Sequence, residues 1–501
     1  MAESLLKLKE RVKDLFHLRG ISALLDWDQQ TYMPPGGAAE RAEASALVSK
    51  ISHELFTSDE TGELLAQAEV DLQGVSEESD EARELKVLRR DYDLATRLPV
   101  DLVAELARHS ALAQEIWTRA RAQSDFAAFA PALEKMVELV RRQASCLGYK
   151  DHIYDPLIDL YEPGCRQATV AAMFAELRPQ LVRLTKAIAA SDSGAGDRVL
   201  RGDFPPEAQR AFTLKAAADL GYDLTRGRQD EAAHPFATNF SRDDVRITTR
   251  FDPLFLAQGL YGSLHEAGHA MYEQGSPAEY EGTALAGAVS LGIHESQSRF
   301  WENLIGRSRA YMEYLLPQLR ASFPGRFDSV GVETLYHAVN VVEPSFIRVE
   351  ADEVTYNLHV LLRFDLECDL LTGKLKVADL PEAWNAGMME YLGIRPPDDA
   401  HGVLQDIHWS GGMIGYFPTY SIGNLVSAQL LHSAEAALPD LQGMICKGEF
   451  EPLLEWLRHN VHRYGRKYMP DELIRKATGE PLSSSCYVSY LNRKYGELYG
   501  V

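Results

Sequence analysis

Apolar residues recur three and four positions apart along most of the chain. Segments such as LLKLKERVKDLFHL and LIGRSRAYMEYLLPQL show this spacing, which is typical of amphipathic helices, and strand-like alternation is scarce. The pattern therefore predicts a mainly α-helical protein. No linker rich in Pro, Gly or Ser interrupts it, so we expect one domain over residues 1–501, with a helical part over roughly 1–220 and a second part over roughly 221–501.

The clearest break in the helical pattern lies between Gly221 and Phe251. In its second half polar residues alternate with apolar or β-branched ones, which are Val245, Ile247, Thr249 and Phe251. A period of two predicts a short strand or β-hairpin. As an edge strand beside the next helix, it would be placed to pair with an extended peptide and hold it across that helix.

The next helix is predicted from about Pro253 to Gln274. Asp252 suits the cap, Pro253 suits the first helical position, and Gly275 suits the stop.

The composition is that of a globular protein and excludes some classes of partner. Hydrophobic residues make up 46% of the 501 positions and charged residues 25%, which provides ample material for a large core. Acidic residues outnumber basic ones by 73 to 51, and the formal net charge of -22 would repel a nucleic acid or an anionic membrane.

The N-terminus and the cysteines predict a cytoplasmic protein. The first twenty residues mix charged with apolar positions and lack the features of a secretory signal. The longest uncharged apolar stretch, TALAGAVSLGI, is far shorter than the roughly 18 residues that a membrane span needs. Five cysteines form no CxxC pair, and we expect reduced, mostly buried thiols at Cys146, Cys165, Cys368, Cys446 and Cys486.

The strongest chemical signal lies in the predicted helix, in the stretch SLHEAGHAMYEQG. His265 and His269 are one turn apart on one face, a spacing that lets two imidazoles bind one tetrahedral cation. Glu266 is close enough to accept a proton from a water molecule at that cation. The motif alone is only moderately specific, because an ordinary amphipathic helix also accommodates two histidines at this spacing.

A hydrolytic zinc site needs a third protein ligand, and Glu295 is the candidate. Twenty-five residues separate it from His269, which leaves room for a second helix to return beside the first. This is the ligand plan of gluzincin proteases, many of which use an aspartate one turn after the glutamate to orient a ligand histidine. Arg299 occupies that position here, and Glu302, two turns on, is either the substitute or a surface charge.

Six short motifs follow one another along the chain. They are HPF (234–236), DVRIT (244–248), HEAGH (265–269), HESQ (294–297), IRVEAD (347–352) and GVLQDIHW (402–409), and DWDQQTYMPPGG (26–37) precedes them. In this order they resemble the carboxypeptidase Taq family of metallocarboxypeptidases over nearly the whole chain. The resemblance implies a large helical metallopeptidase fold with a deep central groove, one wall of which is the N-terminal part. It also implies a small strand element beside the HExxH helix, a divalent metal at the groove floor, and a homodimer.

The resemblance also implies roles for individual residues. Glu266 acts as the general base, and the developing oxyanion needs further donors. His234 and Tyr420 are candidates, because similar helical zinc peptidases use a histidine and a tyrosine in this way. His234 is alternatively the cap of a turn before Pro235, and Tyr420 is alternatively a core aromatic residue with a satisfied hydroxyl.

Release of C-terminal residues requires a group that recognises a free carboxylate. A guanidinium is the best match, and Arg348 is our choice, with Arg246 as the alternative. Arg348 would be held in place by Asp352, four residues on if the segment is helical. Gln405 is predicted to touch the substrate C-terminus.

We therefore expect a metal-dependent carboxypeptidase that acts on peptides with a free C-terminus. The expected cofactor is one Zn²⁺ per chain, and the same ligands would accept Co²⁺ or Mn²⁺. One alternative is a metallo-oligopeptidase that cuts short peptides internally. The other is a catalytically silent helical binding scaffold, which is disfavoured because all three ligands and the base are present.

Overall fold

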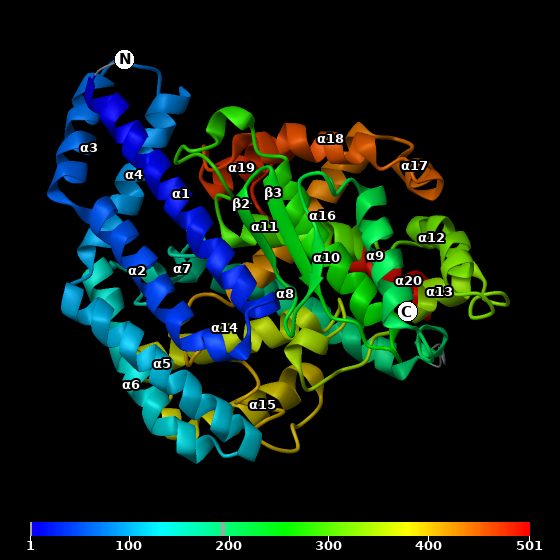
Figure 1. The fold of residues 1–501 in the computed structure, drawn as a ribbon. Coiled ribbons are helices and arrows are strands. Elements are labelled where there is room, and N and C mark those ends of the chain that lie inside the picture. Colours follow the sequence, from blue (N-terminus) through cyan, green and yellow to red (C-terminus); the bar gives the residue numbers. More distant parts are fainter. Residues whose placement is uncertain (1–2, 192–195) are drawn as a thin grey trace.

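The structure is a computed structural model, and it describes residues 3–191 and 196–501. Helices dominate it, as the hydrophobic spacing predicts (Figure 1). The N-terminal part contains α1 (Glu3–Thr31), α2 (Ala38–Thr57), α3 (Asp59–Asp71), α4 (Asp80–Arg97), α5 (Val100–Gln123), α6 (Phe126–Leu147), α7 (Asp155–Ile158), α8 (Gln167–Ala190) and α9 (Pro206–Leu220).

A second set of helices follows a small sheet. Its members are α10 (Leu256–Gln274), α11 (Leu291–Arg299), α12 (Arg309–Ser322), α13 (Val332–Ala338), α14 (Tyr356–Thr372), α15 (Leu380–Leu392), α16 (Pro418–Ala437), α17 (Leu441–Lys447), α18 (Glu451–Asn460), α19 (Pro470–Thr478) and α20 (Ser485–Tyr499). A π-helical turn, Phe300–Ile305, continues α11.

Three short strands form the sheet, which lies beside α10 (Figure 1). They are β1 (Gln229–Glu231), β2 (Ala237–Ser241) and β3 (Asp244–Thr249), in the order β1-β3-β2. β3 pairs parallel to β1 and antiparallel to β2. The predicted alternation is observed in β3, where Val245 and Ile247 are fully buried.

β3 does not offer the free edge that the sequence analysis expects. It is the central strand, so its backbone N–H and C=O groups are hydrogen-bonded to β1 on one side and to β2 on the other. The edge strand β2 packs against α1 instead. At Gly20 of α1 a Cβ would lie only 2.9 Å from the carbonyl oxygen of Phe240, so this close approach requires a glycine.

The helix α10 begins at Leu256, three residues later than predicted. The carboxylate of Asp252 accepts a hydrogen bond from the backbone N–H of Leu254 at 2.8 Å, which closes a turn ahead of the helix instead of capping it. The helix ends at Gln274, as predicted, and Gly275 follows it.

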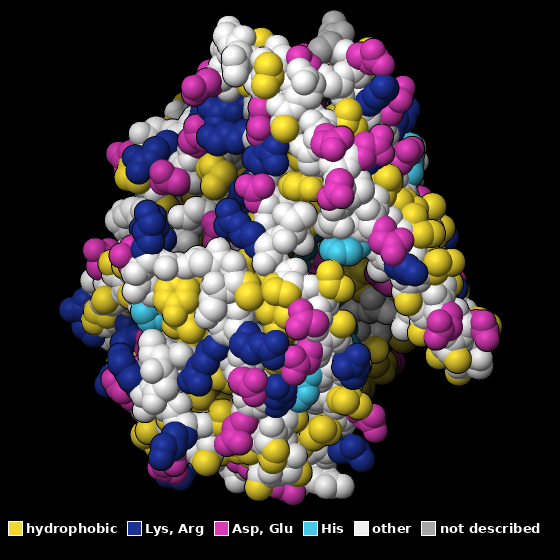
Figure 2. All heavy atoms as spheres, turned by 90° about the vertical axis from the view of Figure 1, so that its left-hand side faces the viewer, with side chains coloured by type: hydrophobic (Ala, Val, Ile, Leu, Met, Phe, Trp, Pro, Cys, Tyr) yellow, Lys and Arg dark blue, Asp and Glu magenta, His cyan; other side chains and the backbone are white. Residues whose placement is uncertain are grey.

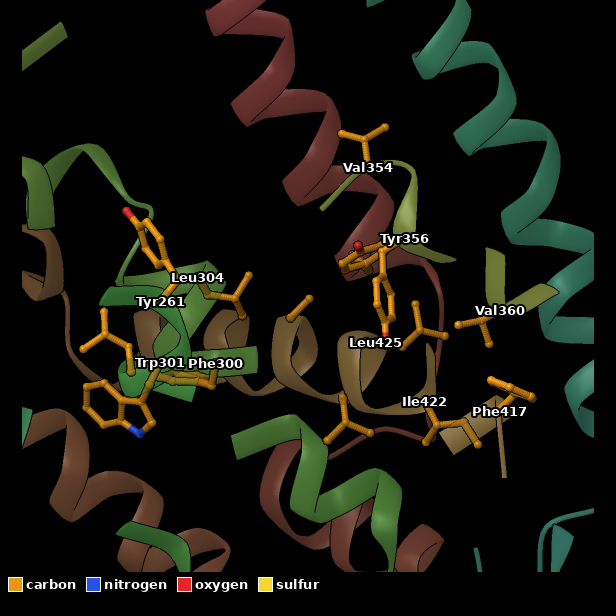
Figure 3. Packing of buried hydrophobic residues seen from close by; sticks show 14 of the residues in the cluster. Tyr261, Phe300, Trp301, Leu304, Val354, Tyr356, Val360, Phe417, Ile422 and Leu425 are labelled. Carbon is orange, nitrogen blue, oxygen red and sulfur yellow. The ribbon is translucent and has the colours of Figure 1, made fainter. Parts of the chain in front are cut away.

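One large hydrophobic core joins elements from α5 to α20. Figure 3 shows part of this core around α16, where Ile422 and Leu425 belong to the same cluster as Tyr356 and as Phe300 and Trp301 of the π-helical turn. Through this core, α16 packs closely against α11. At Gly423 of α16, a Cβ would lie 2.7 Å from the Cβ of Glu295.

Two cavities lie between the N-terminal helices and the segment that leads into α11. The first, of about 420 Å³, is bordered by α4, residues 160–163 and the start of α11. The second, of about 460 Å³, is bordered by α1, α2 and α4. Both are lined by Asp91 and Arg466, so they adjoin, and we call them together the N-terminal cleft.

None of the helices in the described ranges is long and apolar enough to cross a membrane. All five cysteines are free, but the prediction that most of them are buried is wrong. Only Cys368 is buried, Cys146 is exposed, and the other three are partly exposed.

Candidate active site

The predicted ligands meet where α10 and α11 cross. A Cβ added at Gly268 would lie 2.6 Å from the carbonyl oxygen of Gln297, so the two helix backbones approach as closely as a glycine allows. This crossing places His265 and His269 of α10 opposite Glu295 of α11.

The geometry of these three side chains fits a zinc-sized cation. Their ligand atoms all lie within 4.8 Å of one another. Oε2 of Glu295 lies 3.6 Å from Nε2 of His265 and 3.5 Å from Nε2 of His269. Bonds of about 2.0–2.1 Å at tetrahedral angles would separate two ligand atoms by roughly 3.4 Å.

Hydrogen bonds from the far side of each ring fix which nitrogen faces the cation position. Nδ1 of His265 lies 2.8 Å from Oε2 of Glu302, and Nδ1 of His269 lies 3.1 Å from the backbone oxygen of His294. With Nδ1 donating, each ring presents the lone pair of Nε2 toward Glu295. Glu302 thus takes the orienting position and is not a surface charge.

Arg299 occupies the position of the usual aspartate and binds both nearby carboxylates. Its Nε donates to Oε1 of Glu295 at 2.7 Å, and its Nη1 donates to Oε2 of Glu302 at 3.1 Å. The guanidinium also lies over the ring of Tyr356, 4.5 Å from its centroid. The Arg299 guanidinium therefore links Glu295, Glu302 and the helix α14.

The two ligand histidines have opposite pKa shifts. Burial lowers the pKa of His269 to about 3, so its lone pair is available at neutral pH. Burial also disfavours a proton on His265, but the carboxylates of Glu295 and Glu302 outweigh it and raise the pKa to about 9. A metal ion at Nε2 of His265 would therefore have to displace a proton.

The ligand carboxylate is held in its ionised form. Burial acts against its ionisation, yet Arg299 and the two histidines keep the pKa of Glu295 well below its ordinary value.

Glu266 and His294 flank the cluster. Glu266 is buried, and burial raises its pKa to about 7, which suits a group that exchanges a proton near neutral pH. The ring of His294 stacks on that of His269, with centroids 4.3 Å apart, and its Nε2 lies 3.0 Å from Oε1 of Glu273. His294 is therefore engaged beside the ligands.

Arg348 lies in a short 3-10 turn, and its side chain is buried. Nε and Nη2 donate to Oδ1 of Asp406 at 3.1 and 2.9 Å, and Nη1 donates to the hydroxyl of Tyr356 at 2.9 Å. Among the residues that the structure describes, these are its only side-chain hydrogen bonds, so one N–H on each terminal nitrogen lacks a partner. Two such donors match a carboxylate.

The predicted pairing of Arg348 with Asp352 is wrong. That pairing requires both residues on one α-helix, but the helix α14 begins only after them. Asp352 instead accepts two backbone N–H groups at the start of α14, at 2.9 and 3.0 Å. Asp406, which also lies 2.6 Å from Nη2 of Arg363, is the residue that holds Arg348.

Sequence reasoning missed Tyr356 and Arg363. Both lie on α14, seven residues apart and therefore on one face of the helix, and this spacing is the signal that would have found them.

Tyr420 lies in the first turn of α16 and packs on Arg348. The guanidinium carbon is 4.8 Å from the centroid of the tyrosine ring, and the tyrosine hydroxyl lies 3.3 Å from Nε2 of His408. Burial raises the pKa of Tyr420 well above its ordinary value, so the hydroxyl remains protonated and able to donate. The structure thus brings Tyr420 and Arg348 together.

No hydrogen bond or ion pair within the described residues joins the other three predicted residues to His265, His269 or Glu295. His234 is exposed in the loop between β1 and β2, and no hydrogen bond or ion pair joins it to the described part of the site. The Gln405 side chain accepts the backbone N–H of Arg348 at 2.8 Å and donates to three backbone carbonyls. Arg246 binds its neighbour Asp244 at 2.8 Å.

The chain is similar to known proteins over nearly its whole length. The family model of the carboxypeptidase Taq (M32) metallopeptidases matches residues 7–495. Thermostable carboxypeptidase 1 of Thermus thermophilus is 42% identical over 98% of both chains, and carboxypeptidase 1 of Bacillus subtilis is 38% identical over 97% of both.

Solved structures show the same fold. The M32 carboxypeptidase of Deinococcus radiodurans R1 superposes with a TM-score of 0.96 at 44% identity, covering 100% of each chain. Metallocarboxypeptidase 1 of Trypanosoma cruzi superposes with a TM-score of 0.94 at 34% identity, covering 98% of this chain and 99% of the other.

Proposed function

The chain belongs to the carboxypeptidase Taq (M32) metallopeptidase family and is a metallocarboxypeptidase, and from this premise we propose that it removes amino acids one at a time from peptide C-termini. The observation that carries the proposal is the pair of N–H donors on Arg348 that have no partner among residues 3–191 and 196–501, close to the metal cluster. Tyr356 connects the two places, because it binds Arg348 and lies against Arg299, which holds the ligand Glu295.

The terminal carboxylate of the peptide binds the free donors of Arg348. Asp406 fixes the guanidinium from behind, so the donors keep one direction. This anchor leaves the last peptide bond over the cluster. An amidated C-terminus cannot offer two acceptor oxygens, and the same anchor therefore favours free peptides over amides and over internal bonds.

The bond is broken by water. His265, His269 and Glu295 would hold a divalent cation, and its Lewis acidity would polarise the scissile carbonyl and make water more acidic. Glu266 takes a proton from the attacking water and later delivers it to the leaving amine. Tyr420 donates its hydroxyl to the developing oxyanion. We assign no catalytic role to His234, whose loop is exposed.

We further propose Zn²⁺ as the metal, because two imidazole nitrogens and one carboxylate suit it, and Co²⁺ or Mn²⁺ would be accepted by the same ligands. The family resemblance supports a homodimer. The free cysteines support the cytoplasm as its location.

The substitution Glu266→Gln tests the assigned base. Glutamine keeps the shape of the side chain but cannot take up the proton, so we expect kcat on a free-acid peptide to fall by about 10²–10⁴-fold. Metal content per chain, measured by atomic emission, should stay at the wild-type value. Glu279→Gln, at an exposed position after α10, is the control and should leave kcat unchanged. A fully metallated Glu266→Gln protein with wild-type kcat would refute the assignment.

A further inference from the structure

The N-terminal cleft begins beside the metal cluster. Its first cavity is lined by His294, whose ring stacks on the ligand His269, and by Tyr161, whose ring lies 5.1 Å from that of Tyr416. Its second cavity continues from there beneath α1. The two cavities meet at the Asp91–Arg466 ion pair, which lines both, so a chain that leaves the cluster on the His294 side has two adjoining spaces available.

The charged residues that line this cleft are mostly basic. They are three arginines and one aspartate: Arg19, Arg90, Arg466 and Asp91. The chain as a whole carries a formal charge of -22. Figure 2, which views the molecule from the side of the N-terminal helices, shows acidic and basic side chains interspersed over this face. Basic residues therefore outnumber acidic ones in the cleft lining, whereas the outer face around it carries both kinds.

Two of these arginines have partners within the protein. Nη1 and Nη2 of Arg466 donate to the two carboxylate oxygens of Asp91 at 2.8 and 2.9 Å. Nη2 of Arg90 donates to a carboxylate oxygen of Asp159 at 2.9 Å. Their charges are therefore balanced by aspartates.

Arg19, on α1, has no such partner. Its side chain is exposed to the cleft and makes no ion pair or hydrogen bond with any residue in the described ranges. Nearby Glu273 is already bound by His294 and by Asn239, each at 3.0 Å.

The direction of the peptide follows from the proposed function, on which this inference rests. Arg348, which packs on Tyr420, holds the C-terminal carboxylate, so the rest of the peptide must lead away from Arg348. The cleft opens at His294, beside His269. The residues upstream of the scissile bond therefore have the cleft available to them.

We propose that the N-terminal cleft binds the upstream part of the peptide and that Arg19 is a specificity residue that favours an acidic side chain there. The apolar residues Leu15, Phe16 and Leu88 line the same cavity and would contact the aliphatic parts of the bound chain. The enzyme should then prefer peptides with a glutamate or aspartate at one position upstream of the bond that is cut.

Matched peptides test this proposal. A single Glu is moved along the upstream positions of an otherwise neutral peptide, and each peptide is compared with its Gln twin by kcat/KM. At one position we expect the wild type to prefer Glu by about two- to fivefold, the size of a solvent-accessible ion pair. Arg19→Gln should abolish the preference, and Arg19→Lys should retain part of it.

Lys13→Gln is the matched control, because it removes one exposed positive charge from the same helix outside the cleft lining. It should keep the wild-type preference. Equal kcat/KM for all Glu and Gln twins in the wild type, or an unchanged preference in Arg19→Gln, would overturn the proposal.

A binding measurement separates this proposal from the proposed function. Dissociation constants of the labelled Glu and Gln twins are measured by fluorescence anisotropy with the inactive Glu266→Gln protein, with and without Arg19→Gln. A Glu preference that depends on Arg19 supports the subsite even if the wild type shortens neither peptide. In that case the carboxypeptidase reaction would be refuted and the subsite would stand. Equal dissociation constants overturn the subsite whatever the activity.

Discussion

Glu295 shares its carboxylate between two kinds of partner. One oxygen is held by Arg299, and the other faces the two ligand histidines. Arg299 also binds Glu302, which in turn orients His265. The ligand set is thus supported by a chain of charged hydrogen bonds, in which each member limits the rotamers of the next.

Replacement of Glu302 should weaken metal binding. Glu302→Ala removes the acceptor of His265 Nδ1 and leaves Arg299 with one carboxylate fewer, so we expect metal affinity to fall by about 10- to 100-fold. Competition with a calibrated chelator measures it.

The control is Glu313→Gln, which removes a carboxylate paired with Arg309 on α12. It should bind metal as the wild type does. An unchanged affinity in Glu302→Ala would show that the hydrogen bond does not support the site.

For single residues, the sequence predicts the metal ligands better than it predicts the residues that hold the site residues in place. The spacing of His265 and His269 follows from one helix turn, so it is visible along the chain. The partner of Arg348 is not visible in this way. Asp406 lies 58 residues away in a loop, and only the tertiary fold brings it to the guanidinium.

Helix packing sets the distance between the ligands. α11 is enclosed by α10 on one side and α16 on another, and both contacts are made at glycines, Gly268 and Gly423. In each case a Cβ would meet the backbone or the ligand side chain of α11 at less than 3 Å. The glycine in HEAGH is therefore a packing requirement of the site.

Gly268→Ala should push α11 away from α10 and misplace Glu295. Overpacking of this kind costs about 1–3 kcal/mol, against a gain of about 1 kcal/mol in helix propensity, so we expect lower metal affinity and a stability that is unchanged or reduced by up to about 2 kcal/mol. Chelator competition and thermal unfolding measure the two quantities.

Gly262→Ala on the same helix is the control, because its Cβ would make only an ordinary contact of 3.5 Å with Thr249. It should bind metal normally and unfold at a higher temperature. Equal metal affinity in the two variants would contradict the packing argument.

Helices are predicted well from the sequence because their period is local, and α10 ends where its glycine indicates. Its start is predicted less well, because Asp252 also satisfies a turn, and the sequence does not decide between the two uses. The position of β3 inside the sheet depends on β1, which is three residues long and shows no alternation.

The whole molecule places residues from distant parts of the chain around one cleft. Asp91 of α4 binds Arg466, which lies 375 residues later, and α1 packs along β2. The resemblance to a known family predicts such a groove, but hydrophobic spacing contains no information on which helices border it. No sequence pattern therefore marks Arg19 as a substrate-binding residue, and only the fold places it in the lining of the cleft.

Carboxypeptidase action is the central claim, and one measurement tests it most directly. The metal-loaded protein is incubated with an unstructured peptide and with its C-terminally amidated twin, and both are followed over time by mass spectrometry. We predict a ladder of single-residue losses from the free-acid peptide and none from the amide, because only a free carboxylate fills both donors of Arg348. Internal cuts in both peptides would contradict the account, as would no cleavage with Zn²⁺, Co²⁺ or Mn²⁺.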